Sequence, residues 1–398
     1  MARILVASIP VAGHINPLVP VVRALCGRGH DVAWYTGSKY RGRVDASGAR
    51  WIGPTHARDY DDAYIDREYP ERTKLHGLAK LKFDMKHVFM DNALAQLRDV
   101  QHIAAGFAPD VLLCEAGSLG GLFHSEQSGV PLAVLGVIPL ARSSIDTAPF
   151  GLGLAPDAST LGHLRNRALN WAVEHVLFRD VQRYWNETRA KVGLPPNVRF
   201  IGMIPVDAPR DWTPPPFWHE LDGSRPVVHV TQGTLANTTP QLIAPTLEGL
   251  AQEDVLVVVA TGGPAPETLG LRDVPGNARV GTFFSYPALL PKTAVMITNG
   301  GYGGVQMALA HGVPLIVAGT SEDKPEVAVR VACAGAGLNL RTATPTPEQV
   351  RRAVRTLIDE PRFRARAQAL AADYARYDAV KLAVDAVEGL AGAARAPR

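Results

Sequence analysis

Thr298-Asn299-Gly300-Gly301-Tyr302-Gly303-Gly304-Val305 is the most informative stretch of the sequence. The apolar run 294–297 before it predicts a buried strand, and residues 306–311 after it predict a short helix that ends before Pro314. Leu315–Ala318 then predicts a second strand. A strand, a glycine-rich turn, a helix and another strand form a βαβ unit, which indicates an α/β fold with a parallel sheet.

The glycines of this stretch favour an anion site. They let the backbone approach a ligand closely, and the N–H groups at the start of the next helix suit a phosphate. The stretch also lies at the carboxyl end of a predicted parallel strand, where open α/β sheets bind ligands. Close packing of the helix on the sheet is the other explanation for the same glycines. A P-loop motif and a Gly-x-Gly-x-x-Gly after the first strand are both absent from the sequence, which argues against a P-loop nucleotidase and a Rossmann dehydrogenase.

The composition is that of an ordinary soluble enzyme. The chain has 398 residues, of which 46% are hydrophobic and 20% charged, enough for two domains with substantial cores. Its net charge of +3 is too small to indicate nucleic acid as a partner. Cys26, Cys114 and Cys333 lie far apart without zinc spacing, so we expect a cytoplasmic protein. The sequence shows no signal peptide and no apolar run of transmembrane length, and it leaves a homodimer open.

Strand and helix patterns alternate on both sides of a proline-rich linker. The apolar runs that predict further strands are 2–9, 31–36, 49–52, 110–114, 132–135, 227–231, 255–260 and 278–283. The helical patterns run from Pro17 to Gly27 and over 74–106, 119–128, 161–192, 241–251, 325–332, 346–359 and 362 onwards. The chain is therefore predicted to contain two α/β units in tandem, with the crevice between them as the default ligand site.

Two segments between these elements raise separate questions. Asp59-Tyr60-Asp61-Asp62 formally contains an Asp-x-Asp of the kind that binds a metal with a sugar nucleotide. It lacks a flanking apolar strand, so we interpret it as a solvated loop and expect no metal site. Residues 137–160 show no clear element, and loops of this length are uncommon unless they are functional.

Five short motifs are distributed along the chain in a fixed order. They are Gly13-His14-Ile15-Asn16-Pro17, Thr231-Gln232-Gly233-Thr234, Asn299–Gly304, Gly312-Val313-Pro314 and Glu322-Asp323-Lys324. Together they resemble the UDP-glycosyltransferase superfamily with the GT-B fold, especially its bacterial natural-product members of the macrolide and polyketide type. The resemblance covers nearly the whole chain. It implies two Rossmann-like domains that face each other across a deep crevice.

The resemblance also assigns the parts of the chain. Residues 1–205 are expected to bind the acceptor and residues 206–225 to form the proline-rich linker. Residues 226–375 are expected to bind the nucleotide sugar, and the last helix, within 376–398, to return to the N-terminal domain. No cofactor is expected, because the nucleotide sugar is a co-substrate.

In the family, a histidine after the first strand removes a proton from the acceptor hydroxyl, and His14 occupies that position. A free imidazole, with a pKa of about 6.5, can act as a general base at neutral pH. A helix cap or a local turn contact is the structural alternative for this residue. The carboxylate that orients the histidine corresponds to Glu115, where the family has aspartate. Asp110 is the other candidate, but it lies at the opposite end of the same strand and is expected to be structural.

The donor site is expected in the second half of the chain. Its candidate residues are Thr234, Phe283, Tyr286, Asn299, Gly300, Gly301, Gly303, Gly304, Asp323 and Lys324. Thr234 and the N–H groups of Gly300–Gly304 match the donors that stabilise charge on the leaving diphosphate. Phe283 matches the residue that stacks on the base, and core packing is the alternative for Phe283 or its neighbour Phe284.

Besides Glu115, three positions depart from the family pattern. Asn299 replaces a histidine and can still donate to a phosphate through its amide. Met307 replaces a glutamate that holds the ribose, which leaves Gln306 as a candidate for that contact. Lys324 replaces a glutamine. It is expected to pair with Glu322, Asp323 or Glu326, or else to favour an acidic or unusual deoxy sugar.

The predicted function is that of an inverting, metal-independent glycosyltransferase (a hexosyltransferase) in natural-product or antibiotic biosynthesis. It moves a sugar from a UDP- or dTDP-sugar to a hydroxyl of an apolar small molecule. Phe83, Phe89 and Met90 are candidates for the acceptor pocket, with core packing as the alternative. Two other hypotheses stay open: a lipid or sterol glycosyltransferase, and a catalytically degenerate helper protein that binds a nucleotide.

Overall fold

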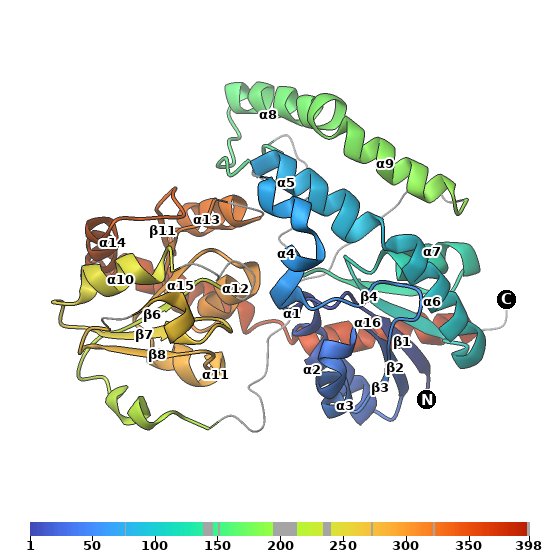
Figure 1. Ribbon diagram of the computed structural model, residues 1–398, viewed down its shortest axis with the longest axis horizontal. Coiled ribbons are helices and arrows are strands. Elements are labelled where there is room, and N and C mark those ends of the chain that lie inside the picture. Colours follow the sequence, from blue (N-terminus) through green and yellow to red (C-terminus); the bar gives the residue numbers. More distant parts are fainter. Residues whose placement is uncertain are drawn as a thin grey trace. The chain divides into compact units, whose positions relative to one another are not determined.

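The structure is a computed structural model (Figure 1) that describes residues 1–75, 77–137, 146–149, 152–193, 213–233, 240–271, 274–320 and 323–395. Its contacts divide the chain into two compact units. The first comprises Met1–Val137, Trp171–Val206 and Asp378–Arg398, and the second comprises Ile138–Asn170 and Asp207–Tyr377. The first unit differs from the expected domain 1–205 because the 138–170 segment groups with the second unit. One contact of this kind joins Gly153 to Pro325, whose Cβ would lie 3.0 Å from a Cβ added at Gly153.

The described strands of the first unit form one parallel sheet in the order β3-β2-β1-β4-β5. These strands are β1 (Arg3–Ala7), β2 (Asp31–Tyr35), β3 (Arg50–Ile52), β4 (Val111–Glu115) and β5 (Leu132–Leu135). Alternate residues of β1 face two different cores: Ile4 and Val6 face one, and Leu5 and Ala7 face the other. Burial on both faces explains why Ile4–Ala7 is a continuous apolar run in the sequence.

The helices of this unit are α1 (Ala12–Ile15), α2 (Leu18–Gly27), α3 (Arg41–Ser47), α4 (Ile65–Glu68), α5 (Gly77–Phe83), α6 (Ala93–Phe107), α7 (Leu119–Ser128), α9 (Arg179–Ala190) and α16 (Ala379–Arg395). Helix α8 (Thr160–Ala172) belongs to the second unit except for its last two residues. The 3₁₀ and π segments are η1 (Ser38–Tyr40), η2 (Asp62–Tyr64), η3 (Pro70–Lys74), η4 (Asp84–Met90) and η5 (Val173–Leu177). The final helix, α16, packs Val384 and Val387 into the core beside α2 (Figure 1). Glu388 of α16 also binds Arg28 at 2.8 Å and His30 at 2.9 Å.

The described strands of the second unit form a parallel sheet in the order β11-β10-β9-β6-β7-β8. These strands are β6 (Val227–Thr231), β7 (Leu256–Ala260), β8 (Ala278–Gly281), β9 (Val295–Thr298), β10 (Leu315–Val317) and β11 (Gly337–Asn339). The helices are α10 (Ile243–Leu250), α11 (Tyr286–Leu289), α12 (Tyr302–Ala310), α13 (Lys324–Cys333), α14 (Pro347–Asp359) and α15 (Pro361–Tyr374). The 3₁₀ segments are η6 (Pro216–Glu220), η7 (Pro266–Leu269) and η8 (Leu290–Lys292), of which η6 lies in the expected linker.

The sequence pattern does not predict β11. This strand is short and contains Gly337 and Asn339, residue types that are depleted in strands. Tertiary packing explains the glycine, because a Cβ at Gly337 would lie 1.9 Å from the carbonyl oxygen of Leu315. Glycine therefore lets β11 pair with β10 in a register that joins Leu315 to Gly337.

Two helices predicted as continuous are interrupted. The 74–106 pattern contains α5, the π turn η4 and α6, and the 161–192 pattern contains α8, the π turn η5 and α9. A π turn contains about one more residue than an α-helical turn. This changes the spacing of the apolar side chains too little for the sequence pattern to show the interruption. In the described part of the chain, no helix is long and apolar enough to cross a membrane.

Asp99 of α6 organises the loop that follows β3. Its carboxylate accepts hydrogen bonds from the N–H groups of Thr55, His56 and Ala57, at 3.2, 2.8 and 3.0 Å. It also accepts one from the hydroxyl of Tyr35 at 2.9 Å and contacts His56 Nδ1 at 2.7 Å. The Asp99 side chain is 2% exposed, so the loop depends on a buried anion.

Asp99→Asn is expected to lower the free energy of unfolding at pH 7 by about 2–3 kcal/mol, because an amide cannot accept from all of these donors. Burial raises the pKa of Asp99, but the bonds from Ala57 and His56 outweigh it and lower this pKa overall. A lowered folded-state pKa stabilises the protein above the unfolded-state value and stops doing so as the pH falls through the folded-state value. The difference between wild type and variant should therefore shrink below about pH 4.

Urea unfolding at pH 7 and at pH 3.5 measures both parts of this prediction. Asp45→Asn is the control, since that side chain is 55% exposed and makes one loose ion pair with Arg41. Equal unfolding midpoints for Asp99→Asn and Asp45→Asn at pH 7 would contradict it.

Candidate active site

His14 and Glu115 meet in the first unit. His14 lies on α1, directly after β1, and Glu115 is the last residue of β4. Because β1 and β4 are adjacent parallel strands, their carboxyl ends bring the two side chains together. The distance from His14 Nδ1 to Glu115 Oε2 is 2.5 Å. Glu115 is fully buried, whereas the His14 side chain is 17% exposed.

Two backbone N–H groups hold Glu115 in place. Ile9 N donates to Oε1 at 3.0 Å, and Gly117 N donates to Oε2 at 2.6 Å. Since a carboxylate only accepts hydrogen bonds, the contact with Oε2 assigns the imidazole hydrogen to His14 Nδ1. Nε2 then keeps its lone pair and is able to accept a proton.

The other candidate carboxylate lies at the opposite end of the strand. Asp110 precedes β4, and its Oδ2 accepts a hydrogen bond from Arg3 N at 2.7 Å. This bond joins the start of β4 to the start of β1. Of the two acids, Glu115 is the one that contacts His14.

In the second unit, Asn299 joins the turns after β6 and β9. Its Nδ2 donates to the carbonyl oxygen of Gln232, and its Oδ1 accepts from Gly301 N at 3.3 Å. Gly300 N donates to Thr298 Oγ1 at 3.2 Å. The N–H groups of Gly300 and Gly301 therefore have partners within the protein.

The next helix, α12, begins earlier than predicted. It starts at Tyr302, and Val305 N donates to Gly301 O at 3.1 Å. Gly303 and Gly304 therefore belong to the helix and not to the turn. The N–H groups of the first three helical residues precede this first helical bond, so they are the donors of the motif that suit an anion.

Two glycines allow the ends of the strands to approach each other. Gly300 has a φ of +93°, a conformation that favours glycine. A Cβ added at Gly319, two residues after the end of β10, would lie 1.9 Å from the carbonyl oxygen of Asn299. Gly319 was not singled out in the sequence, because its role depends on a neighbour that is distant along the chain.

The aromatic candidates lie in different environments. Phe283 is 60% exposed, whereas Phe284 packs against a core cluster and meets Phe217 edge-on at 5.9 Å. Phe284 is therefore the core residue of the pair. Tyr286 meets His229 edge-on at 5.5 Å, and its hydroxyl would lie 3.9 Å from a Cβ added at Gly304.

His229 of β6 was missed in the sequence. Its Nδ1 contacts the carbonyl oxygen of Val258 at 2.9 Å, and its Nε2 has no partner among the described residues. Burial lowers the pKa of His229 to about 4, and burial raises the pKa of Tyr286 to about 12. Both rings are therefore neutral near pH 7, and Tyr286 lies beside Gly304 in the first turn of α12.

Comparisons with known proteins identify the family. The model of the erythromycin biosynthesis protein CIII-like C-terminal domain matches residues 244–384. 4'-Demethylrebeccamycin synthase from Lentzea aerocolonigenes is 42% identical over 98% of this chain and 99% of its own. UDP-glucosyltransferase A1 from Starmerella bombicola is 31% identical over 98% of this chain and 92% of its own. The chain belongs to the UDP-glycosyltransferase superfamily.

Solved structures show that the fold is shared as well. The glycosyltransferase of kitacinnamycin matches with a TM-score of 0.73 and 21% identity over 98% of both chains. The glycosyltransferase VinC, in complex with dTDP, matches with a TM-score of 0.73 and 20% identity over 98% of this chain and all of its own. These matches confirm the predicted GT-B fold, and the protein is a glycosyltransferase.

In this glycosyltransferase, Lys324 lies beside the glycine turn. Its side chain is buried at the start of α13, and its Cβ would lie 3.4 Å from a Cβ added at Gly300. Asp323 is half-buried at the N-cap of the same helix. Glu326, one of the expected partners of Lys324, pairs with Arg330 at 2.9 Å. Thr234 and Glu322 lie outside the described residues.

The two residues considered for the ribose contact have other partners. Met307 is 5% exposed and belongs to the interior of the second unit. Gln306 Oε1 accepts a hydrogen bond from the Tyr374 hydroxyl at 2.7 Å. The side-chain oxygen of Gln306 is therefore already bonded within the protein.

Of the acceptor candidates of this glycosyltransferase, one is plainly core. Met90 is 8% exposed and belongs to a core cluster with Phe123. Phe89 is half-buried and packs against this cluster and against a second one around Ile9. Phe83 is half-buried, with its ring centroid 4.7 Å from that of His87.

The interpretation of Asp59–Asp62 as a solvated loop is wrong for Tyr60, which is 4% exposed, and for Asp62. Asp62 is 3% exposed, and its carboxylate is bonded to Ala12 N and Tyr40. These partners are more than twenty residues away along the chain, so no local pattern reveals them. Among the described residues, no group of three or more His, Cys, Asp or Glu side chains is arranged to hold a metal.

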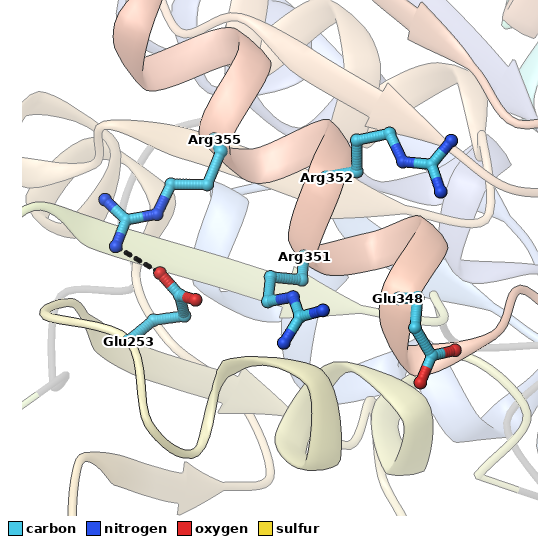
Figure 2. Close-up of a pocket in the computed structure, with 5 residues that line it drawn as sticks. All are labelled: Glu253, Glu348, Arg351, Arg352 and Arg355. Carbon is cyan, nitrogen blue, oxygen red and sulfur yellow. Dashed lines mark ion pairs between the residues drawn. The ribbon is translucent and has the colours of Figure 1, made fainter.

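A surface cavity of about 420 Å³ lies elsewhere in the second unit. Figure 2 shows Arg351, Arg352 and Arg355 of α14 around it, with Glu348 on the same helix and Glu253 paired with Arg355. Glu253 precedes β7, so the cavity lies at the amino end of a parallel strand. The turn after β9 lies at the carboxyl end of its strand, and the cavity is therefore separate from the predicted donor site.

Proposed function

We propose that this glycosyltransferase catalyses inverting, metal-independent transfer of a sugar from a UDP- or dTDP-sugar to a hydroxyl of an apolar natural product. His14 is the general base, and Glu115 orients it. The contact between His14 Nδ1 and Glu115 Oε2 carries this proposal, because it leaves the basic Nε2 available.

The proposed reaction is a single displacement at the anomeric carbon. His14 Nε2 takes the proton of the acceptor hydroxyl while its oxygen forms the new bond to that carbon. The bond from the same carbon to the diphosphate oxygen breaks, and the nucleoside diphosphate leaves with the electron pair. Attack from the side opposite the leaving group inverts the configuration, and the Glu115 carboxylate stabilises the imidazolium that forms.

The donor half of the proposal is supported by the second unit. The first-turn N–H groups of α12 and the dipole of that helix suit the negative charge that develops on the leaving diphosphate. Relatives are named UDP-glucosyltransferases, and a structure of similar fold is described in complex with dTDP. The exposed ring of Phe283 is available to stack on a base.

The acceptor half is supported by the relatives' names and by the first unit. The relative with 42% identity is named for the formation of 4'-demethylrebeccamycin, a natural product. Half-buried apolar side chains, Phe83 and Phe89, lie on α5 and η4 of the same unit as His14. We therefore propose that an apolar acceptor binds in this unit.

UDP or dTDP at about 1 mM is expected to raise the melting temperature, because a ligand at about 100 times its Kd stabilises a protein by roughly 2.7 kcal/mol. A thermal-shift panel with UDP, dTDP, GDP and ADP measures the effect. The His14→Ala variant is the control and should show the same shift, since His14 belongs to the other unit. No shift with any nucleotide, from folded protein, would contradict the donor assignment and favour a catalytically degenerate helper.

A further inference from the structure

Asp62 makes an unexpected contact with the helix that carries His14. Asp62 lies at the start of η2, and its Oδ2 accepts a hydrogen bond from Ala12 N at 2.8 Å. Ala12 is the first residue of α1, two positions before His14. Asp62 is 3% exposed, so this carboxylate is buried beneath the helix and not presented to solvent.

The short helix α1 needs this support. It has four residues, and a helix of that length is not stable by itself. Its N-cap residue is Val11, whose side chain makes no capping hydrogen bond. Asp62 provides from a distance the acceptor that a Ser or Asp normally provides at this position, and its negative charge suits the helix N-terminus.

Asp62 completes a three-point attachment of the segment from Ile9 to His14. Glu115 makes the two outer attachments, since it accepts from Ile9 N at 3.0 Å and contacts His14 Nδ1 at 2.5 Å. Asp62 makes the middle one through Ala12 N. The two acids therefore fix both the backbone and the ring of the residue proposed as the base.

Neighbouring donors fix Asp62 in turn. The Tyr40 hydroxyl lies 2.9 Å from both of its oxygens, and the Lys39 ammonium donates to Oδ1. Burial raises the pKa of Tyr40, and the charge of Asp62 raises it further, so this hydroxyl stays protonated and acts as a donor. A buried carboxylate with these partners keeps one orientation, as a positioning group requires.

We propose that Asp62 is a positioning residue for His14, holding α1 so that Nε2 faces the acceptor hydroxyl. The proposal rests on the role of His14 as the general base. In this role Asp62 acts through Ala12 N and the orientation of α1.

Asp62→Ala is expected to lower kcat roughly 10- to 100-fold with an unchanged KM for the nucleotide sugar, because a misplacement of about 1 Å can reduce a rate to this extent. Asp62→Asn retains a carbonyl acceptor for Ala12 N, so its kcat should lie between those of wild type and Asp62→Ala. Asp61→Asn is the matched control: Asp61 also binds Lys39 but caps Ala63 N and is 42% exposed.

The deciding measurement is kcat of the double variant His14→Ala/Asp62→Ala. If Asp62 acts through His14, removing it from the His14→Ala enzyme should change kcat less than about 2-fold. A further 10- to 100-fold loss in that background, or wild-type kcat for Asp62→Ala, would overturn the proposal. Wild-type kcat for His14→Ala alone would instead overturn the proposed base, which keeps the two failures distinguishable.

Discussion

His14→Ala is expected to lower kcat by roughly 10²–10⁴-fold, the range for loss of a general base. The acceptor hydroxyl would then have to lose its proton to water while it attacks the anomeric carbon. KM for the nucleotide sugar should change little, because the predicted donor residues belong to the other unit. Steady-state kinetics with the nucleotide sugar that gives the larger thermal shift measures both parameters.

His102→Ala serves as the control for this substitution. His102 lies on α6 with an exposed side chain, so its removal should leave both kcat and KM unchanged. If His14→Ala were as active as His102→Ala, His14 would have no part in the mechanism. The dyad with Glu115 would then be a structural contact that holds the turn after β1.

The sheets of this protein were predictable because of their burial. Strands β1 and β7 are buried on both faces, so Ile4–Ala7 and Leu256–Ala260 appear in the sequence as short, unbroken apolar runs. The edge strand β11 does not, since three residues with a glycine at the start carry no such signal. Its existence depends on how closely Gly337 approaches Leu315.

The candidate site was predictable only in part, because contacts between residues far apart in the sequence fix it. A motif shows which residues are neighbours along the chain, and this sufficed to place His14 at the end of the first strand. The bonds that fix the site link residues far apart: Ala12 with Asp62, and Asn299 with Gln232. The amide of Asn299, predicted to face a phosphate, has a backbone carbonyl as a partner, and no sequence pattern encodes that pairing.

Glu115→Gln is expected to reduce both kcat and stability. Gly117 N donates to Oε2 at 2.6 Å, and His14 Nδ1 lies 2.5 Å from the same oxygen. The glutamine amide has one oxygen and one NH₂ group. If its oxygen takes the place of Oε2, the NH₂ faces the donor Ile9 N; if its oxygen takes the place of Oε1, the NH₂ faces Gly117 N and His14 Nδ1. The unsatisfied groups are buried, so we expect a loss of about 2–3 kcal/mol in the free energy of unfolding.

The loss in kcat has two causes. In the orientation that places the amide NH₂ beside His14, Nδ1 becomes an acceptor and the ring hydrogen moves to Nε2, which then has no lone pair for the acceptor's proton. In either orientation the neutral amide lacks the charge that stabilises the imidazolium. In a comparable dyad, a wrong histidine tautomer lowers kcat about 10⁴-fold, so we expect kcat of Glu115→Gln to fall by roughly 10²–10⁴-fold. Steady-state kinetics and urea unfolding of the same preparation separate this loss from the loss of stability.

Asp110→Asn is the control that tests which carboxylate belongs to the dyad. It removes the charge from the bond with Arg3 N at the far end of β4, so it should lower stability by about 1 kcal/mol and leave kcat unchanged. The opposite result, a slow Asp110→Asn enzyme beside an active Glu115→Gln enzyme, would show that the carboxylate was placed wrongly. Asp110 and Glu115 flank the same strand, so comparing the two variants separates an effect on the His14 contact from an effect on the position of β4.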